Sequence, residues 1–431
     1  MRCLLLTQYY PPETGAAPNR LSDWARRLAA WGHQVTVITA VPNYPGGEIF
    51  PAYRDRRFYD ERDDSVRILR ARIYVSRAPG FIRRLLSYFS FVFASLLLGT
   101  TRVGRQDVII VESPPLFLGL SGLWLKLWLR SRMVFNVSDL WPESAVAMGI
   151  LHNRPLIWLS TRFEELCYRC SDLITGQTEN IVADIENRVR VPAALITNGV
   201  DFKIFSESGI AARDVPRHTF GFSDKFVVGY AGLLGLAQGL DVVLDAAELL
   251  LHIPDVLFVF FGDGPEKEHL MRESQRRGLY NVRFYPPESK KTMPAVMASF
   301  DATLVPLKKL DLFKGALPCK LFESMAAATA VIVGIEGEAQ RVVDAADGGI
   351  CVAPEDAGAL AAAVRQLRAD PELRKRLGTN ARSFVIANYD RQEIAAKLNY
   401  LLHQLVGSDQ YPECGSPRED RLSHRRPTAA R

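Results

Sequence analysis

Short apolar segments alternate with amphipathic helical segments along the whole chain, and this alternation limits the fold more than any other feature. Most of the apolar segments are four to six residues long, rich in Val, Ile and Phe, and apolar on both faces. Such segments are typical of parallel strands covered by helices on both sides. We therefore expect an α/β chain with doubly wound domains and right-handed crossovers. The expected strands are Cys3–Leu6, Val35–Thr39, Val108–Glu112, Met133–Val137, Leu173–Thr175, Val227–Ala231, Val256–Phe261, Val282–Tyr285, Ala302–Val305 and Ala330–Val333.

The length of 431 residues allows two or three domains. A domain boundary is expected near Asn198–Asp201, because Asn-Gly is a turn pair and a polar segment separates it from the next strand. We expect a first domain over 1–200 and a second over 201–387. A C-terminal helix over 388–407 is expected to cross back to the first domain, and 408–431 is expected to be disordered because it lacks apolar periodicity.

Charge is unevenly distributed along the chain. Residues 1–200 hold 24 Lys and Arg against 18 Asp and Glu, whereas the net charge of the whole chain is only +5. A net charge this small does not indicate a nucleic-acid partner. All but one of the cations in the first 200 residues are arginines, which suit contacts with phosphates and lipid headgroups.

The six cysteines do not indicate a disulfide framework. The only C-x-x-C pair, Cys167 and Cys170, has no second pair or neighbouring histidines to complete a zinc site. We expect both to be buried and reduced, in a reducing compartment.

The longest uncharged stretch runs over Leu85–Thr101, between Arg84 and Arg102. It falls slightly short of the roughly 20 apolar residues that a membrane span needs. Its aromatic residues and flanking arginines suit a helix that lies in a membrane interface. A buried core helix is the second possibility, and a true transmembrane span is the third. A second apolar helix is expected over Leu116–Arg130, and a lipid-linked acceptor would account for both helices, although they could also bury each other.

Glycine-rich turns follow several of the expected strands. In open parallel sheets, ligands bind at the carboxyl ends of strands, on loops and at helix N-termini. The residues of interest in these turns are Gly15, before a helix at Asn19–Trp31; Gly232, Gly235 and Gln238, before a helix at Asp241–Leu251; and Gly262, Asp263 and Gly264. Each turn alone could also be an ordinary strand–helix connection, and Asp263 could form an Asx turn.

The segment GALPCKLFESMA carries the strongest signal. Pro318 suits a helix start, and Lys320 and Glu323 share one face of the first helical turn. Such a pair can bind two parts of a nucleoside diphosphate. The lysine would face the phosphate oxygens, and the carboxylate would accept hydrogen bonds from the ribose hydroxyls. The alternative is a solvated salt pair. A further glycine turn with Gly337 and Glu338 follows the next strand.

Together these segments resemble the retaining glycosyltransferases of family four, in which two facing Rossmann-like domains form the GT-B fold with an inter-domain cleft. The segments that carry the resemblance are PPETGAAPNR, WGHQVTVIT, ESPPLF, DLWPES, NGVDFKIF, FGDGP and PCKLFESMA. The DLWPES segment and the AQGL turn resemble bacterial enzymes that build cell-surface polysaccharides, including N-acetylfucosamine transferases. The resemblance implies transfer from a nucleotide sugar with retention of configuration and without a metal or other cofactor. The absence of any Asp-X-Asp triplet agrees with this.

The resemblance implies that Glu323 binds the ribose, that Gly15 approaches the diphosphate, and that Gly262 to Gly264 line the base. Two departures from the family pattern stand out. The first Glu of the family's E-x7-E motif is replaced by Gly315. The turn after the first strand of the second domain carries Leu234 and Gln238 where many relatives have Arg and Lys.

These departures leave Lys320 as the expected phosphate cation. Backbone amides around Gly337–Gln340, with Glu338 among them, are candidates for holding the sugar hydroxyls. The catalytic histidine of some relatives has no evident match, and Asp139 is the nearest counterpart. We expect Asp139 to position or deprotonate the acceptor hydroxyl with support from Glu143, although Asp139 could instead be a helix N-cap.

The sequence thus predicts a metal-independent, retaining hexosyltransferase that uses a UDP-linked sugar. Front-side departure of the diphosphate is expected, because no carboxylate nucleophile is evident. The expected acceptor is a polyprenyl-diphosphate-linked sugar at the cytoplasmic face of the inner membrane. A nucleotide-sugar epimerase of the same two-domain plan and a non-catalytic nucleotide-sugar-binding scaffold are the alternatives.

Overall fold

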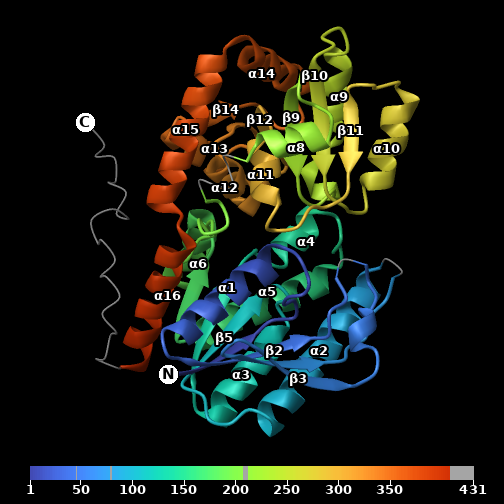
Figure 1. Cartoon of the computed structure of the whole chain (residues 1–431). Helices are drawn as coiled ribbons and strands as arrows, with labels where there is room; N and C mark the ends of the chain where they lie inside the picture. Colours follow the sequence, from blue (N-terminus) through green and yellow to red (C-terminus); the bar gives the residue numbers. More distant parts are fainter. Residues whose placement is uncertain (45, 78–79, 207–211, 408–431) are drawn as a thin grey trace, which may run out of the picture.

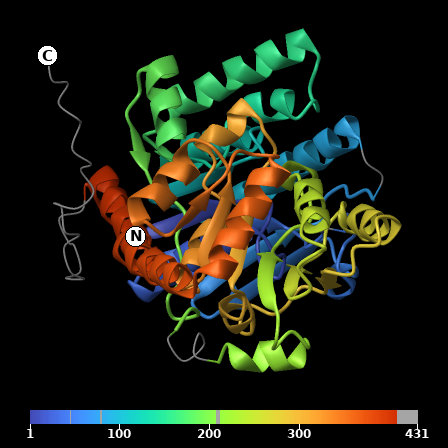
Figure 2. The same ribbon diagram turned by 90° about the horizontal axis from the view of Figure 1, so that it is seen from above.

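The computed structural model describes residues 1–44, 46–77, 80–206 and 212–407, so the predicted disorder of 408–431 lies outside the described residues. Two α/β domains lie one above the other, joined near residue 200 and again by the C-terminal helices (Figure 1). Seen from above, the second domain lies directly over the first (Figure 2). The expected α/β class with two facing Rossmann-like domains is confirmed.

The first domain is built on an eight-stranded sheet in the order β3-β4-β2-β1-β5-β6-β7-β8. Its strands are β1 (Arg2–Leu6), β2 (Gln34–Ala40), β3 (Phe58–Asp63), β4 (Val66–Ala71), β5 (Val108–Ser113), β6 (Arg132–Val137), β7 (Leu173–Gly176) and β8 (Ala193–Leu195). All neighbours are parallel except β3 and β4. Its helices are α1 (Ala16–Ala30), α2 (Phe81–Thr101), α3 (Leu118–Leu129), α4 (Glu143–Ala147), α5 (Arg154–Cys170) and α6 (Glu179–Val189), with a 3-10 turn η1 (Pro51–Tyr53).

The second domain has a six-stranded, fully parallel sheet in the order β11-β10-β9-β12-β13-β14. Its strands are β9 (Phe226–Ala231), β10 (Val256–Phe261), β11 (Val282–Tyr285), β12 (Ala302–Pro306), β13 (Ala330–Gly334) and β14 (Gly349–Cys351). The helices are α8 (Asp214–Thr219), α9 (Asp241–Leu249), α10 (Lys267–Arg276), α11 (Met293–Ala298), α12 (Cys319–Ala326), α13 (Glu338–Ala346), α14 (Ala357–Ala369) and α15 (Pro371–Asn388), with 3-10 turns η2 (Leu236–Gln238) and η3 (Asp311–Gly315).

Each of the ten expected strand segments is a strand, but the sequence pattern missed the β3–β4 hairpin and the two three-residue edge strands, β8 and β14. The hairpin was not predicted because charged residues interrupt the apolar pattern of its two strands. Arg70 in β4 is only 2% exposed, and its guanidinium is compensated by Glu61 at 2.9 Å and by the Pro11 carbonyl. From the sequence alone, a buried arginine that has partners in the fold cannot be distinguished from an exposed one.

The last helix, α16 (Arg391–Val406), leaves the second domain and packs on the first. Its apolar residues Ile394, Leu398 and Leu402 join the core formed by α1 and one face of the first sheet. Figure 1 shows α16 running alongside α1 and α6. The second domain is thereby tied to the first at two points, the linker and this helix.

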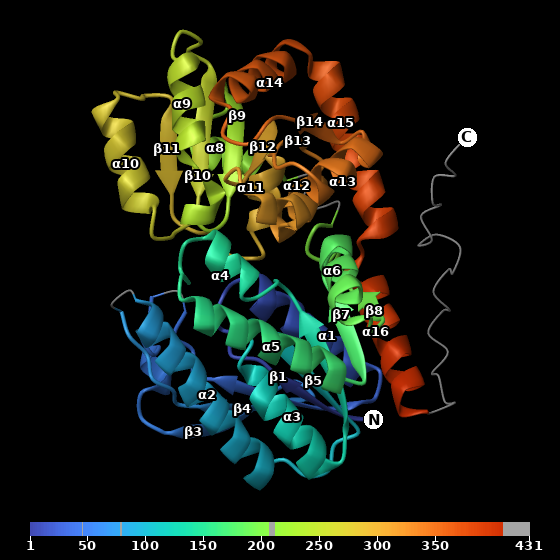
Figure 3. The ribbon, with the colours of Figure 1, turned by 180° about the vertical axis from the view of Figure 1, so that it is seen from behind.

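The helices α2, α3 and α5 cover the other face of the first sheet, and Figure 3 shows them in front of this sheet, below the second domain. Residues 82–101 are long and apolar enough to cross a membrane, but the helix is also part of the fold. Phe91 and Leu98 are buried in the core, whereas Phe93 is 70% exposed. Cys167 is buried as expected, but Cys170 at the end of α5 is exposed; both are free thiols.

Candidate active site

The glycine turns after β9 and β10 pack directly against each other at the carboxyl edge of the second sheet. A Cβ atom on Gly262 would lie 1.9 Å from the Gly232 carbonyl oxygen, and one on Gly264 would lie 2.3 Å from the Leu234 carbonyl oxygen. No side chain fits at either position. The structure therefore brings Gly232, Gly262 and Gly264 into one backbone surface, as a phosphate- or base-binding turn requires.

Lys320 reaches this surface from the first turn of α12. Its Nζ donates to the Tyr230 hydroxyl, lies 4.2 Å from the centre of the Tyr230 ring, and stands 3.5 Å from where a Gly232 Cβ would be. The Tyr230 hydroxyl in turn donates to the Leu233 carbonyl at 2.6 Å. Burial lowers the pKa of Lys320 to about 7, against the opposing effect of the Glu323 carboxylate. Sequence reasoning did not foresee the Tyr230 contact.

Glu323 lies one helical turn beyond Lys320. Burial raises the pKa of its carboxyl group, while Arg391, Lys290 and Lys320 act in the opposite direction. Arg391 is the first residue of α16, and its Nε donates to the Gly199 carbonyl at 2.8 Å in the linker. The crossing helix thus brings a cation toward Glu323 from a segment that the sequence analysis did not connect with the site.

Gly235 and Gln238 form the turn of η2 before α9. A Cβ on Gly235 would lie 2.8 Å from the Gln238 Oε1, and this buried oxygen has no hydrogen-bond partner among the described residues. An unpaired buried polar atom beside a glycine turn is suited to a ligand contact. Asp263, by contrast, is largely exposed; its Oδ1 accepts from the N–H of the next residue, Gly264, at 2.9 Å and lies 3.9 Å from the Lys267 Nζ.

Gly15 is the N-cap of α1, in the connection that follows the carboxyl end of β1. The α1 residues Asp23 and Arg26 influence the pKa of Lys290, which lies in the second domain between β11 and α11. The middle of α1 and the segment of the second domain that carries Lys290 therefore approach each other.

The structure uses Glu338 differently from the sequence expectation. Its side chain is buried, and its two carboxylate oxygens accept from the backbone N–H groups of Glu179 at 2.9 Å and Asn180 at 3.3 Å. These amides begin α6 in the first domain, where a carboxylate also complements the helix dipole. The Glu338 carboxylate is thus committed to a contact between the domains and not to donor hydroxyls. Gly337, just before it, stands against the Lys314 backbone.

Gly315 departs from the family pattern for a reason visible in the structure. A Cβ at this position would lie 2.8 Å from the Asn180 Nδ2 and 2.9 Å from its Cβ. Asn180 of the first domain therefore occupies the space into which a glutamate side chain would extend. The polar group at this point of the cleft comes from α6.

Asp139 stands in the turn after β6, at the carboxyl edge of the first sheet. Burial, with a smaller effect from Glu143, raises the pKa of its carboxyl to about 6 against hydrogen bonds from the Ser144 side chain and the Leu140 backbone. A carboxyl group poised this close to neutrality can serve as a general base. The capping alternative is wrong, because the N-cap of α4 is Pro142 and no side chain caps this helix; the Ser144 bond comes from its side chain.

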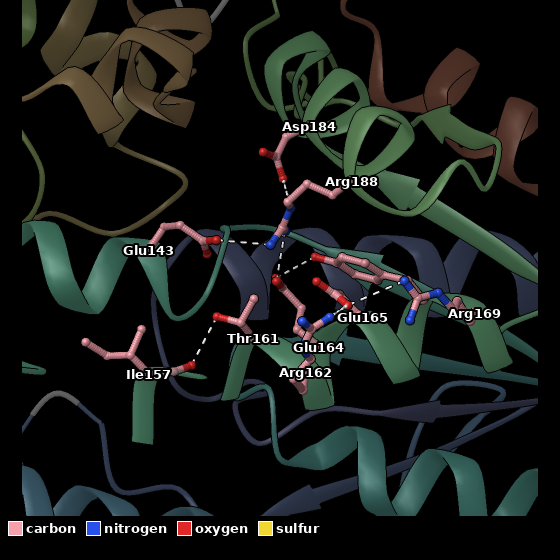
Figure 4. A network of polar contacts seen from close by, with 10 residues as sticks. Glu143, Ile157, Thr161, Arg162, Glu164, Glu165, Arg169, Asp184 and Arg188 are labelled. Atoms are coloured by element: carbon pink, nitrogen blue, oxygen red, sulfur yellow. Dashed lines mark hydrogen bonds and ion pairs between the residues drawn. The ribbon is translucent and has the colours of Figure 1, made fainter. Parts of the chain in front are cut away.

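Glu143 does not contact Asp139 as expected. Its Oε1 lies 3.0 Å from Arg188 Nη1, and the same guanidinium also pairs with Glu164 at 2.8 Å and Asp184 at 2.6 Å (Figure 4). Burial raises the pKa of Glu164 to about 7. Glu143 therefore holds the start of α4 on α5 and α6, and acts on Asp139 only through its charge.

The described residues contain one group that could hold a metal ion, formed by Asp241, Glu266 and His269. The His269 Nε2 lies 2.9 Å from Asp241 Oδ1, and both side chains are about half exposed. The sequence analysis did not predict this group, because its ligands come from the starts of two different helices, α9 and α10. Exposed acidic groups of this kind are common without a metal, and the group lies outside the Lys320–Glu323 site.

Two facing Rossmann-like domains, with glycine turns, a buried lysine and a carboxylate at the facing edges, define a glycosyltransferase of the GT-B fold. The comparisons agree: residues 216–384 match the family described as glycosyl transferases group 1, and residues 15–199 match the glycosyl transferase 4-like domain. The chain belongs to these glycosyltransferases, and the predicted hexosyltransferase class is confirmed.

Some curated relatives match over nearly the whole chain. The colanic acid biosynthesis glycosyl transferase WcaI of Escherichia coli K12 is 28% identical over 407 residues, which are 91% of this chain and 98% of the relative. Among solved structures, the sucrose-phosphate synthase of Thermosynechococcus elongatus has a TM-score of 0.76 at 19% identity and covers 94% of this chain and 99% of its own. The Anabaena HepE structure in complex with UDP and glucose has a TM-score of 0.69 at 18% identity, covering 93% and 99%.

Proposed function

We propose that this chain is a retaining, metal-independent glycosyltransferase that moves a sugar from a UDP-sugar to a lipid-linked saccharide during cell-surface polysaccharide biosynthesis. The observation that carries the proposal is the position of the Lys320 ammonium on the glycine surface of Gly232 and Gly262, with Glu323 one turn away. This arrangement supplies a cation, backbone amides and a helix N-terminus for a diphosphate, and a carboxylate for ribose hydroxyls.

The proposed chemistry needs two contributions from the protein. Charge that develops on the departing diphosphate is stabilised by Lys320 and by the N-terminal amides of α12. The acceptor hydroxyl attacks the anomeric carbon from the face that the diphosphate leaves, so the old carbon–oxygen bond breaks as the new one forms. Asp139 takes the hydroxyl proton. The UDP part of the proposal draws support from the HepE complexes, and the polysaccharide part from the WcaI relative. The narrower assignment to N-acetylfucosamine transferases stays a prediction.

Release of UDP tests this proposal against the epimerase and the scaffold. A panel of UDP-sugars and GDP-sugars is incubated with the protein, with and without a polyprenyl-diphosphate-linked acceptor. The free nucleoside diphosphate is then measured. We expect release from UDP-sugars that depends on the acceptor. Interconversion of the donor without acceptor would support an epimerase, and donor binding without release under any condition would support a scaffold.

The acceptor side of the proposal rests on the exposed face of α2, α3 and α5. This face carries large apolar side chains that are at least 40% exposed: Ile82, Leu86, Phe93, Leu97, Leu120, Trp124, Leu127, Trp128, Trp158, Leu159 and Leu166. Exposed arginines flank it, namely Arg83, Arg84, Arg102, Arg105, Arg130, Arg154, Arg162 and Arg169. Apolar side chains bordered by cations suit the surface of an anionic membrane, and we propose that the protein binds the cytoplasmic face of the inner membrane there.

Vesicle binding provides a direct measurement. The protein is expected to sediment with vesicles that contain phosphatidylglycerol, more weakly with pure phosphatidylcholine, and less at high salt because screening weakens the arginine contacts. Replacing Trp124 and Leu127 together by serine should weaken binding about tenfold or more, since burial of each side chain contributes roughly 1.5–3 kcal/mol. The matched control replaces Val215 and Tyr280, which are 65% and 66% exposed on the second domain. Equal binding by the two double variants would refute the assignment.

A further inference from the structure

Five polar side chains form a closed hydrogen-bonded group at the carboxyl edge of the first sheet. We name this group the Ser138 ring; it consists of Arg20 from α1, Glu112 from β5, Ser138 after β6, Gln177 after β7 and Asn198 in the linker. Ser138 is half-buried and the other four are buried. Three of these residues lie in segments that the sequence analysis singled out, PPETGAAPNR, ESPPLF and NGVDFKIF, without a role for them.

The hydrogen bonds of the Ser138 ring run in a circle. Arg20 donates from Nη2 to Ser138 Oγ at 2.7 Å and to Glu112 Oε1 at 2.6 Å, and from Nη1 to Asn198 Oδ1 at 3.1 Å. Asn198 Nδ2 donates to Gln177 Oε1 at 2.9 Å, and Gln177 Nε2 donates back to Ser138 Oγ. The Ser138 hydroxyl donates to Glu112. Ser138 therefore accepts two bonds and donates one, which uses its full capacity.

This group is an unusual way to stabilise a fold. A buried ion pair such as Arg20 with Glu112 is weak evidence for stability, because apolar replacements of the same volume are often equally stable. The ring also lies at the carboxyl edge of the sheet and not in its middle. The charge of Arg20 acts on the thiol of Cys319, which is the residue before Lys320 in the opposite domain. The location points to the reaction site.

Asp139 follows Ser138 directly in the chain. The Ser138 N–H donates to the Ser113 carbonyl at 2.8 Å, so both the backbone and the side chain of Ser138 are fixed. Asp139 itself lies in an irregular turn before α4. The direction of its carboxyl group therefore depends on the residue that precedes it and on the bonds from Ser144 and Leu140.

We propose that the Ser138 ring is a positioning device for Asp139, in which Arg20, Gln177 and Glu112 fix the Ser138 hydroxyl and thereby aim the neighbouring carboxylate at the acceptor hydroxyl. The inference rests on the proposed role of Asp139 as the base. Ser138 and its partners are positioning residues, because none of them needs to touch the substrate for this effect. They determine the rate of the chemical step and leave the donor site of the other domain as it is.

The test compares Ser138→Ala with Ser131→Ala. Ser131 lies at the opposite end of β6, is also buried, and its Oγ has no partner among the described residues. We expect Ser138→Ala to lower kcat by about 10- to 100-fold and to leave the KM for the UDP-sugar within twofold, since a misplaced base affects only the chemical step. Ser131→Ala should resemble the wild type. A Ser138→Ala protein with wild-type kcat would overturn the proposal.

A double-mutant cycle with Asp139→Asn separates positioning from general damage. If the ring acts through Asp139, adding Ser138→Ala to Asp139→Asn should leave the residual turnover unchanged. An additive loss would overturn the proposal. Normal turnover of Asp139→Asn alone would instead refute the proposed base and leave the ring without that function. Should Ser138→Ala fail to fold, as judged by its thermal transition, Asn198→Ala takes its place in the cycle, with an expected loss of about 3- to 10-fold in kcat.

Discussion

Asp139→Asn is expected to lower turnover by about 10²- to 10⁴-fold, the range over which a positioned general base contributes to a rate. Asparagine has the same shape but cannot accept the proton of the acceptor hydroxyl. Affinity for UDP should stay unchanged, because Lys320 and Glu323 lie on the other domain. Turnover is measured as acceptor-dependent UDP release, and affinity by calorimetry.

The same substitution decides between the base and a purely structural role. Asparagine keeps a side-chain oxygen that can accept the bonds from Ser144 and Leu140, so a residue that only orders this turn would tolerate the change. Wild-type turnover in Asp139→Asn would therefore leave the residue with a structural role. A large loss, with an unchanged thermal transition, would identify it as a participant in the chemistry.

The pH dependence of the rate offers an independent view of Asp139. Because burial raises the pKa of its carboxyl to about 6, the carboxylate form predominates only above that pH. Thus kcat/KM should fall about tenfold per pH unit as the pH drops below 6, and this acidic limb should be absent from the residual activity of Asp139→Asn. A limb that persists unchanged in the variant would belong to another group.

Lys320→Met is expected to have the second large effect, on the donor. Loss of a charge-assisted contact with a diphosphate costs roughly 1.5–3 kcal/mol, which corresponds to about 10- to 150-fold in affinity. Turnover should fall further, because the negative charge on the leaving diphosphate is larger in the transition state than in the bound donor. Binding of UDP-glucose is measured by calorimetry, with Lys375→Met on the exposed surface of α15 as the control.

This lysine also makes donor binding depend on pH in the neutral range. Burial lowers the pKa of Lys320 to about 7 in the free protein, and a bound diphosphate would raise it. Binding therefore takes up a proton, and affinity for UDP-glucose should fall by up to about tenfold per pH unit as the pH rises above 7. The diphosphate of UDP-glucose does not titrate near neutrality, so the effect belongs to the protein. A pH dependence that is the same in Lys320→Met would contradict this account.

Much of the fold followed from local patterns in the sequence. Runs such as VLFVFF are buried on both faces and can only be central parallel strands, and glycines after them mark turns at the carboxyl edge. The β3–β4 hairpin did not follow, because the buried Arg70 and its half-buried partner Glu61 are charged and interrupt the apolar pattern. The helix start that carries Lys320 and Glu323 followed from neighbouring residues in the same way, since α12 begins directly after Pro318.

Only the tertiary structure determines which residues distant in sequence form hydrogen bonds and ion pairs with each other. The sequence by itself determined the two parallel sheets, their glycine turns and the helix that carries Lys320 and Glu323, since each depends on residues within one or two helical turns. It could not assign Glu338 to the amides of α6, Glu143 to Arg188, or Arg20 to Ser138, whose partners lie 45 to 159 residues away. The sequence around a carboxylate does not indicate which group will pair with it. That partner is determined only when the elements and the two domains pack together.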